Sequence, residues 1–130
     1  MTPSTNLTSQ PSAERPLRVL VADDEPMIIR VLKRLLERRG HEVHAAADAY
    51  EAIDLLNDGD FDAVLVDQRM PGGGVSVLTR LDDMEFDGVA VLMTGGVATD
   101  PLNVSIGVRR LQKPFPFPSI IPLLEGHEPN

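Results

Sequence analysis

Two short apolar runs in this chain each end in aspartate, and this pattern limits the folds open to it. Residues 63–66 (Ala-Val-Leu-Val) lead directly into Asp67, and residues 18–22 lead into three successive acidic residues at 23–25. A short apolar run bounded by turn-forming residues is typical of a strand buried in a parallel sheet. Open α/β sheets place their chemistry at the carboxyl ends of such strands. We therefore expect these carboxylates to meet at one rim of a sheet.

Most of the remaining chain alternates between strand and helix patterns. Pro26 and Gly40 bound the first helix, because proline suits a first helical turn and glycine a helix end, and Asp48 is the expected cap of the second. Such units, joined by short loops, imply a parallel sheet with helices on both faces. We expect strands at residues 17–22, 42–45, 61–66, 88–93 and 109–112, helices at 26–39, 48–57 and 75–83, and a weak final helix at 119–124 interrupted by Pro122.

Residues 95–108 are the least regular part of the pattern. Gly95-Gly96, Pro101 and Gly107 all disfavour a continuous helix. This segment therefore has room for only a short, poorly formed fourth helix.

Length and composition set further bounds. The chain has 130 residues, which is one domain, and its polar first segment lacks apolar periodicity. We expect a disordered lead-in at 1–16, a folded domain at 17–126 and a tail at 127–130. A net charge of −8 argues against a nucleic-acid-binding surface, and the lack of cysteine excludes disulfides and thiolate metal sites. No apolar stretch is long enough to span a membrane and no signal pattern is present, so we expect a cytoplasmic protein.

Four of the expected strands end in polar groups that suit phosphoryl transfer. Asp23 and Asp24 follow the first strand, Asp67 the third, Thr94 the fourth and Lys113 the fifth. Crowded carboxylates repel one another unless a cation compensates, and oxygen ligands of this kind suit Mg²⁺. Asp67 can act as a carboxylate nucleophile while the acidic pair holds the cation. Thr94 can donate a hydrogen bond, and Lys113 can neutralise developing oxygen charge.

These residues occur in an order and spacing that resemble a known family. The chain is similar to the receiver domain of bacterial two-component response regulators from about residue 17 to residue 124. The resemblance implies a flavodoxin-like, doubly wound five-stranded parallel sheet with strand order 2-1-3-4-5. The motifs that carry it are Asp23-Asp24-Glu25-Pro26, Asp67 with Met70-Pro71-Gly72, Thr94-Gly95, and Lys113-Pro114-Phe115, with a cis peptide bond expected after the lysine.

The resemblance also assigns roles. It implies that Asp67 accepts a phosphoryl group from a phosphohistidine on a sensor histidine kinase or histidine phosphotransfer protein. Asp24, Asp67 and the backbone carbonyl of Arg69 would hold Mg²⁺ directly, and Asp23 through water. We expect a stand-alone receiver that is a phosphorylation switch or phosphorelay intermediate, not an enzyme. It would act on a downstream protein target, without direct contact to nucleic acid or membrane.

Some positions depart from the family pattern. Receivers commonly carry Tyr or Phe three residues before the site lysine, and here that position is Arg110. The segment between Thr94 and Lys113 is also a few residues short. Arg69 places a long cation two residues after the acceptor. These departures bear on output and on the lifetime of the phosphoryl group more than on phosphorylation itself.

The first helix is the expected partner-docking surface. We expect a stripe led by Ile29 and Leu32 to pack on the sheet. Surplus apolar residues then remain near the site, and an exposed patch of that kind marks a partner surface, although a wide core face is the alternative. The expected docking residues are Met27, Ile28 and Val31, together with Pro114 and Phe115 after the site lysine.

Other functions fit the sequence less well. A phosphoaspartate hydrolase of the haloacid-dehalogenase type needs a second aspartate where Arg69 stands. A flavodoxin needs a hydroxyl- and glycine-rich phosphate loop after the first strand, where the acidic cluster would repel phosphate. A receiver-like module that is never phosphorylated has no need of the acidic pair, the acceptor, the threonine and the lysine together. The histidines at 41, 44 and 127 lack metal-ligand spacing, and we expect surface or strand positions for them.

Overall fold

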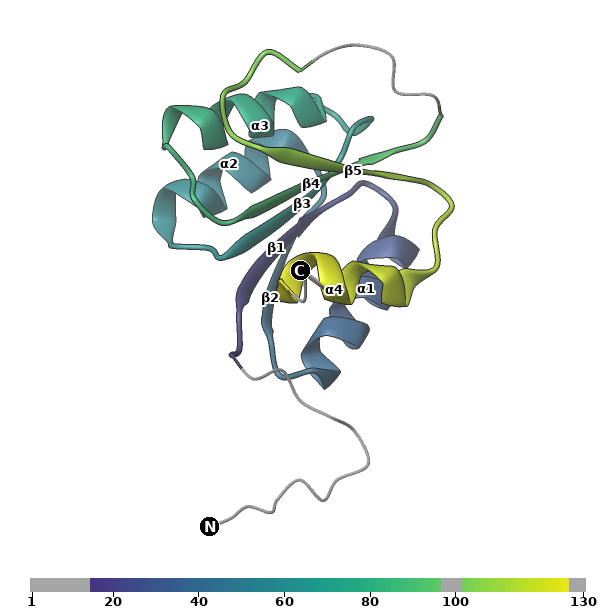
Figure 1. Cartoon of the computed structure of the whole chain (residues 1–130). Coiled ribbons are helices and arrows are strands. Elements are labelled where there is room, and N and C mark those ends of the chain that lie inside the picture. Colours follow the sequence, from purple (N-terminus) through teal and green to yellow (C-terminus); the bar gives the residue numbers. More distant parts are fainter. Residues whose placement is uncertain (1–14, 97–101, 127–130) are drawn as a thin grey trace.

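A five-stranded parallel sheet forms the centre of the molecule, with helices on both faces (Figure 1). The computed structural model describes residues 15–96 and 102–126. Its strand order, β2-β1-β3-β4-β5, confirms the prediction. The elements are β1 (Arg18–Ala22), α1 (Pro26–Arg38), β2 (Glu42–Ala46), α2 (Ala49–Asp58), β3 (Ala63–Asp67), α3 (Gly74–Asp83), β4 (Val89–Thr94), β5 (Val108–Gln112), the 3-10 helix η2 (Phe117–Ser119) and α4 (Ile120–Glu125).

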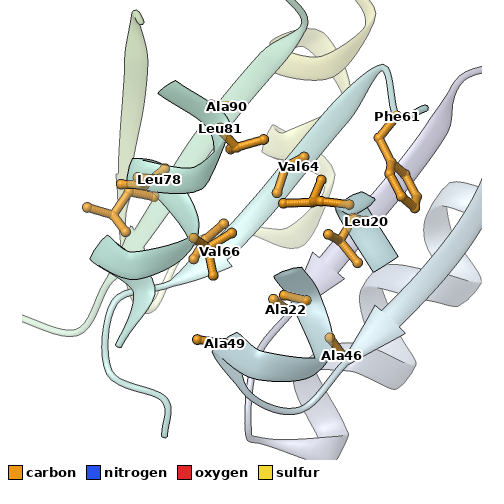
Figure 2. Close-up of a cluster of buried hydrophobic side chains, with 14 of the residues drawn as sticks. Leu20, Ala22, Ala46, Ala49, Phe61, Val64, Val66, Leu78, Leu81 and Ala90 are labelled. Carbon is orange, nitrogen blue, oxygen red and sulfur yellow. The ribbon is translucent and has the colours of Figure 1, made fainter. Parts of the chain in front are cut away.

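Side chains alternate between the two faces of the strands and so build two cores. Leu20 and Ala22 of β1 belong to the core beneath α2 and α3, whereas Val19 and Val21 belong to the core beneath α1 and α4. Figure 2 shows the first of these cores. Every residue of β3 is buried, as expected for a strand covered on both faces. Asp67 is the last residue of this strand and is therefore held by a rigid frame.

The ends of the first two helices follow the predicted signals. Pro26 occupies the first turn of α1, and Gly40, with a φ of +97°, lies just beyond its end in a conformation that favours glycine. The Asp48 side chain accepts a hydrogen bond from the backbone N–H of Glu51 at 2.7 Å and so caps α2. Both predictions are confirmed.

The expected fourth helix is absent from the described part of the segment between β4 and β5. Residues 102–107 are irregular, and residues 97–101 lie outside the described residues. The Asp82 side chain accepts hydrogen bonds from the backbone N–H groups of Ser105 and Ile106, at 2.9 and 3.1 Å. Apolar side chains of this segment then cover the sheet in place of a helix. They are Leu102, Val104, Ile106 and Val108.

The final helix corrects a second expectation. Pro122 does not interrupt it, because α4 runs continuously over Ile120–Glu125 with Pro122 in its first turn. Backbone N–H groups of a first turn have no acceptor within the helix, so a proline there costs little. Ile120 and Leu124 face the core and fasten α4 to the sheet.

His41 is buried, contrary to the expected surface or strand position. Its Nδ1 accepts a hydrogen bond from the Leu17 N–H at 2.9 Å, and its Nε2 lies 2.8 Å from a carboxylate oxygen of Glu125 at the end of α4. Arg39 also pairs with Glu125. Burial opposes ionisation of Glu125, but the hydrogen bonds from Arg39 and His41 outweigh it and hold its pKa below the ordinary value. This cluster joins the start of β1, the end of α1 and the end of α4.

The expected lead-in and tail fall at the two ends of the chain. Residues 1–14 and 127–130, and with them His127, lie outside the described residues. Within the described part, His44 lies on β2 as expected. No helix in residues 15–96 or 102–126 is long and apolar enough to cross a bilayer.

We predict that Glu125→Ala lowers the free energy of unfolding by about 2–4 kcal/mol, because Arg39 and the buried His41 lose the carboxylate that pairs with them. Since the pKa of Glu125 is held low, its contribution is present above the ordinary glutamate pKa and is lost as the pH falls through the lower value of the folded state. Urea unfolding across this pH range measures both effects. Glu37→Ala, at an exposed position of α1, is the control and should change little. Equal stability of Glu125→Ala and wild type would contradict the prediction.

Candidate functional site

Strand ends bring the predicted residues together at the carboxyl edge of the sheet. Asp23 follows β1, Asp67 ends β3 and Thr94 ends β4. Carboxylate oxygens of Asp23, Asp24 and Asp67 lie within 4.8 Å of one another. Asp23 is fully buried and Asp67 is 5% exposed, whereas Asp24 is open to solvent. The structure therefore forms the acidic cluster that the sequence predicted.

Lys113 reaches into this cluster from the residue after β5. Its Nζ lies 2.8 Å from Asp23 Oδ2, 3.2 Å from Glu25 Oε1 and 3.4 Å from Asp67 Oδ1. The Lys113 N–H donates to the Thr94 carbonyl, which holds this segment against the end of β4. The peptide bond between Lys113 and Pro114 is cis, as predicted. A single ammonium is thus shared by three carboxylates.

The charges in the site shift the pKa values of both Asp67 and Lys113 upward. Burial of Asp67 raises its pKa, and repulsion from Asp23 adds to this, against the lowering effects of Lys113 and of a hydrogen bond from the Arg69 backbone N–H. Burial of Lys113 would lower its pKa, but its bonds to Asp23, with Asp67 and Glu25, outweigh that effect. The pKa of Asp67 is thus raised by burial first and by Asp23 second, whereas the pKa of Lys113 is raised by its carboxylate neighbours.

The loop after β3 brings the start of α3 close to the backbone of Asp67. A Cβ on Gly74, the first residue of α3, would lie 2.3 Å from the carbonyl oxygen of Asp67. Only glycine allows that approach, and the Gly74 N–H donates to the Gln68 carbonyl at 3.1 Å. The Arg69 side chain points to solvent. The glycine-rich sequence predicted a helix entry but not that it closes on Asp67.

Thr94 and Arg110 occupy contrasting environments. Thr94 is 3% exposed and is the last residue of β4, at the same edge of the sheet as Asp67. Arg110 lies on β5, and its side chain is exposed to solvent. The position that carries an aromatic residue in many receivers is therefore occupied here by an arginine on the exposed side of β5.

Only some of the predicted docking residues lie at the surface. Met27 is 53% exposed, Pro114 is exposed and Val31 is half-buried. Ile28 and Phe115 are buried in the core beneath α1 and α4, so their assignment to a partner surface was wrong. The helix is rotated relative to the expected stripe. Its buried residues are Ile28, Leu32 and Leu36, at intervals of four, while Ile29 and Leu35 lie half-buried beside them.

The sequence predicted that the Glu25 carboxylate lies at this rim, but two features of the site region were missed. The first is the ion pair of Glu25 with Lys113; the weak suitability of Glu25 as a helix cap was the available signal, because caps favour Ser, Thr, Asp and Asn. The second is the solvent face of α1, where four exposed cations follow one another at helical spacing. They are Arg30, Lys33, Arg34 and Arg38.

Sequence comparison now identifies the family. The sequence model of the response regulator receiver domain matches residues 19–121. The chain belongs to this family. It is 42% identical over 76 residues to the sensory/regulatory protein RpfC of Xanthomonas campestris, a stretch that covers 58% of this chain and 10% of RpfC. The receiver chain therefore spans only about a tenth of the length of this relative.

Solved structures agree with the fold. A CheY-like receiver from Methanospirillum hungatei matches with a TM-score of 0.79 at 23% identity, covering 87% of this receiver and 94% of that chain. The response regulator TrrA of Thermotoga maritima matches with a TM-score of 0.71 at 30% identity, covering 80% and 92%. The TrrA structure was determined in complex with Mg(2+)-BeF. Receiver domains belong to two-component signalling. In this receiver the acidic cluster lies at the carboxyl edge of the sheet.

The donor set of this receiver fits a hard divalent cation. Two of its three clustered carboxylates are buried, and all ligand atoms are oxygens. Oxygen ligands of this kind bind Mg²⁺, commonly with water completing the shell, which the exposed side of Asp24 leaves room for. Among the described residues, Lys113 is the cation that pairs with these carboxylates, and it leaves a net negative charge. The site can therefore attract a second cation.

Proposed function

We propose that Asp67 accepts a phosphoryl group from a phosphohistidine of a histidine kinase or histidine phosphotransfer protein. The observation that carries this proposal is the position of Asp67. Its carboxylate ends a fully buried strand and lies within reach of both the acidic pair and Lys113. The signal would pass on by phosphorylation-dependent protein interaction or by onward phosphotransfer in the cytoplasm.

In the proposed reaction an Asp67 carboxylate oxygen attacks the donor phosphorus. The new O–P bond forms as the P–N bond to histidine breaks, and the electron pair of that bond stays on the imidazole nitrogen. Lys113 Nζ, 3.4 Å from Asp67 Oδ1, is placed to neutralise charge on the transferring oxygens. The hydroxyl of Thr94 would donate a hydrogen bond to one of them. We regard the receiver as a phosphorylation switch and not an enzyme acting on an external substrate.

Mg²⁺ would be held by Asp24, Asp67 and the backbone carbonyl of Arg69, with Asp23 acting through water. When bound, the ion would offset the negative charge of Asp67 and of the incoming phosphoryl oxygens. Asp23 Oδ2 already accepts a hydrogen bond from Lys113 Nζ at 2.8 Å, which supports a less direct part for Asp23 in metal binding.

The hydrolase alternative lacks its second carboxylate. A haloacid-dehalogenase-like enzyme requires an aspartate two residues after the nucleophile, and here the exposed side chain of Arg69 stands there. The acid cluster and Lys113 are also formed as the phosphoacceptor role requires, which weighs against a receiver-like module that is never phosphorylated.

We predict that Asp67→Asn abolishes phosphorylation while the fold survives, because the amide keeps the shape of the carboxylate and removes its nucleophilic charge. The protein is incubated with Mg²⁺ and acetyl phosphate, and intact mass is measured by mass spectrometry. Wild type should gain one phosphoryl group, and Asp67→Asn none. A labile phosphoryl group on the Asp67→Asn variant would refute the assignment.

In the same assay, Asp24→Ala should need more Mg²⁺ than wild type to reach the same extent of reaction.

The surface for the protein donor would lie on α1 and the loop after β5. Met27 and Pro114 are exposed close to the site, and Val31 is half-buried one turn along the helix from Met27. The basic face of α1, defined by Arg30, Lys33, Arg34 and Arg38, lies on the same helix as Met27 and Val31. Apolar anchors bordered by charge are typical of protein interfaces.

We predict that Met27→Glu slows transfer from a phosphorylated histidine phosphotransfer protein by at least about tenfold, since a charge in the centre of an apolar contact is costly. Phosphorylation by acetyl phosphate should not change. The matched control is Val75→Glu, at a 46% exposed apolar position on α3. Radiolabel transfer and intact mass measure the two reactions.

Two outcomes would contradict the docking assignment. The first is equal slowing by Met27→Glu and Val75→Glu. The second is a Met27→Glu variant that is phosphorylated at the wild-type rate both by the histidine phosphotransfer protein and by acetyl phosphate. Loss of both reactions in Met27→Glu would indicate a folding defect, which circular dichroism would reveal.

A further inference from the structure

Glu25 stands where a helix cap is expected but does not act as one. It is the residue before α1, and its carbonyl accepts hydrogen bonds from the N–H groups of Ile28 and Ile29. Its side chain makes no capping bond to the helix. Instead its Oε1 lies 3.2 Å from Lys113 Nζ. The side chain has therefore turned from the helix to the site.

The backbone of Glu25 is fixed by the same site. Its N–H donates a hydrogen bond to Asp23 Oδ1 at 2.9 Å, so the residue is tied to the carboxylate that Lys113 binds through Oδ2. The Glu25 side chain itself is 59% exposed, whereas that of Asp23 is fully buried. Of the three carboxylates around Lys113, Glu25 is thus the one that can turn to solvent without leaving a buried charge.

The ammonium of Lys113 has three protons and three carboxylate neighbours. A phosphoryl group on Asp67 brings further anionic oxygens to the same ammonium. Lys113 can bind such an oxygen only by giving up or weakening one of its present contacts. The bond to buried Asp23 is the shortest of the three, and Asp67 is the residue that carries the new group.

We propose that Glu25 is a positioning residue that holds Lys113 in the unphosphorylated receiver and releases it when a phosphoryl group arrives. This inference rests on the proposed role of Asp67. Glu25 then opposes phosphorylation in two ways. It competes for Lys113, and it adds a negative charge at the entrance to a site that must admit an anion. The receiver therefore has a lower affinity for phosphoryl-like ligands than its other site residues would give it.

Two variants separate the contact from the charge. Glu25→Gln keeps the length of the side chain and removes its charge. Glu25→Asp keeps the charge and shortens the side chain by one methylene, so that it no longer reaches Lys113 at hydrogen-bonding distance. Glu37→Gln, an exposed carboxylate on the same helix, is the control for a change of net charge. All measurements use the full chain at saturating Mg²⁺.

The first measurement is the equilibrium affinity for beryllofluoride, a stable mimic of the phosphoryl group, followed by ¹⁹F NMR. We expect Glu25→Gln to bind it about two- to fivefold more tightly than wild type, the range set by a partly exposed ion pair. Glu25→Asp should bind more tightly than wild type but less tightly than Glu25→Gln. The second measurement is the rate of phosphorylation by acetyl phosphate at different donor concentrations. Glu25→Gln should lower the apparent KM for acetyl phosphate, because the negative charge of Glu25 is removed from the path of the anionic donor.

Each outcome decides the proposal. Unchanged affinity and unchanged KM in Glu25→Gln would overturn it while the phosphoacceptor function stands. A gain in Glu25→Gln with no gain in Glu25→Asp would overturn the claim that Glu25 holds and releases Lys113, since the charge alone would then account for the effect. An equal gain in Glu37→Gln would overturn the proposal as well, since the effect would then be one of net charge. A wild-type protein that took neither beryllofluoride nor phosphoryl would overturn the function of Asp67, and this inference with it.

Discussion

The ion-pair cluster around Lys113 is the interaction on which the site depends. One ammonium lies between Asp23, Glu25 and Asp67, and Asp24 adds a fourth carboxylate at the same edge. Like charges this close raise one another's pKa unless a cation offsets them. Lys113 is one cation among these carboxylates, and burial together with Asp23 holds the pKa of Asp67 above its ordinary value. The site therefore carries an excess of negative charge, which a divalent cation would offset before the anionic phosphoryl group arrives.

The rest of the fold keeps these charges together. β1, β3 and β4 are almost wholly buried, so the residues at their ends cannot drift apart without opening a core. Gly74 allows α3 to begin directly against Asp67. At the opposite end of the sheet, Glu125 binds His41 and Arg39 and so fixes α4 across one core. On the core beneath α2 and α3, an irregular segment that is anchored by Asp82 packs where a helix was expected.

The sequence was sufficient to predict the sheet order, most element bounds and the convergence of the strand-end residues, because buried strands and helix caps leave local signals. It was not sufficient where the answer depends on contacts between distant segments. The rotation of α1 that buries Ile28 is set by packing against β-strands and η2, and Phe115 is drawn inward by the same core. His41 is a polar residue, and its burial depends on hydrogen bonds to the distant Leu17 and Glu125. Glu25 likewise became a site residue through Lys113, which lies 88 positions away.

The most direct test of this account is the pKa of Asp67, followed by ¹³C NMR of its carboxyl carbon with and without Mg²⁺. Without the ion, the account predicts a pKa above the ordinary aspartate value, because burial and Asp23 outweigh Lys113. Added Mg²⁺ should lower that pKa, and Asp24→Ala should weaken the effect. An Asp67 that titrates at the ordinary aspartate value, with no change on adding Mg²⁺, would contradict the claim that excess negative charge defines this site.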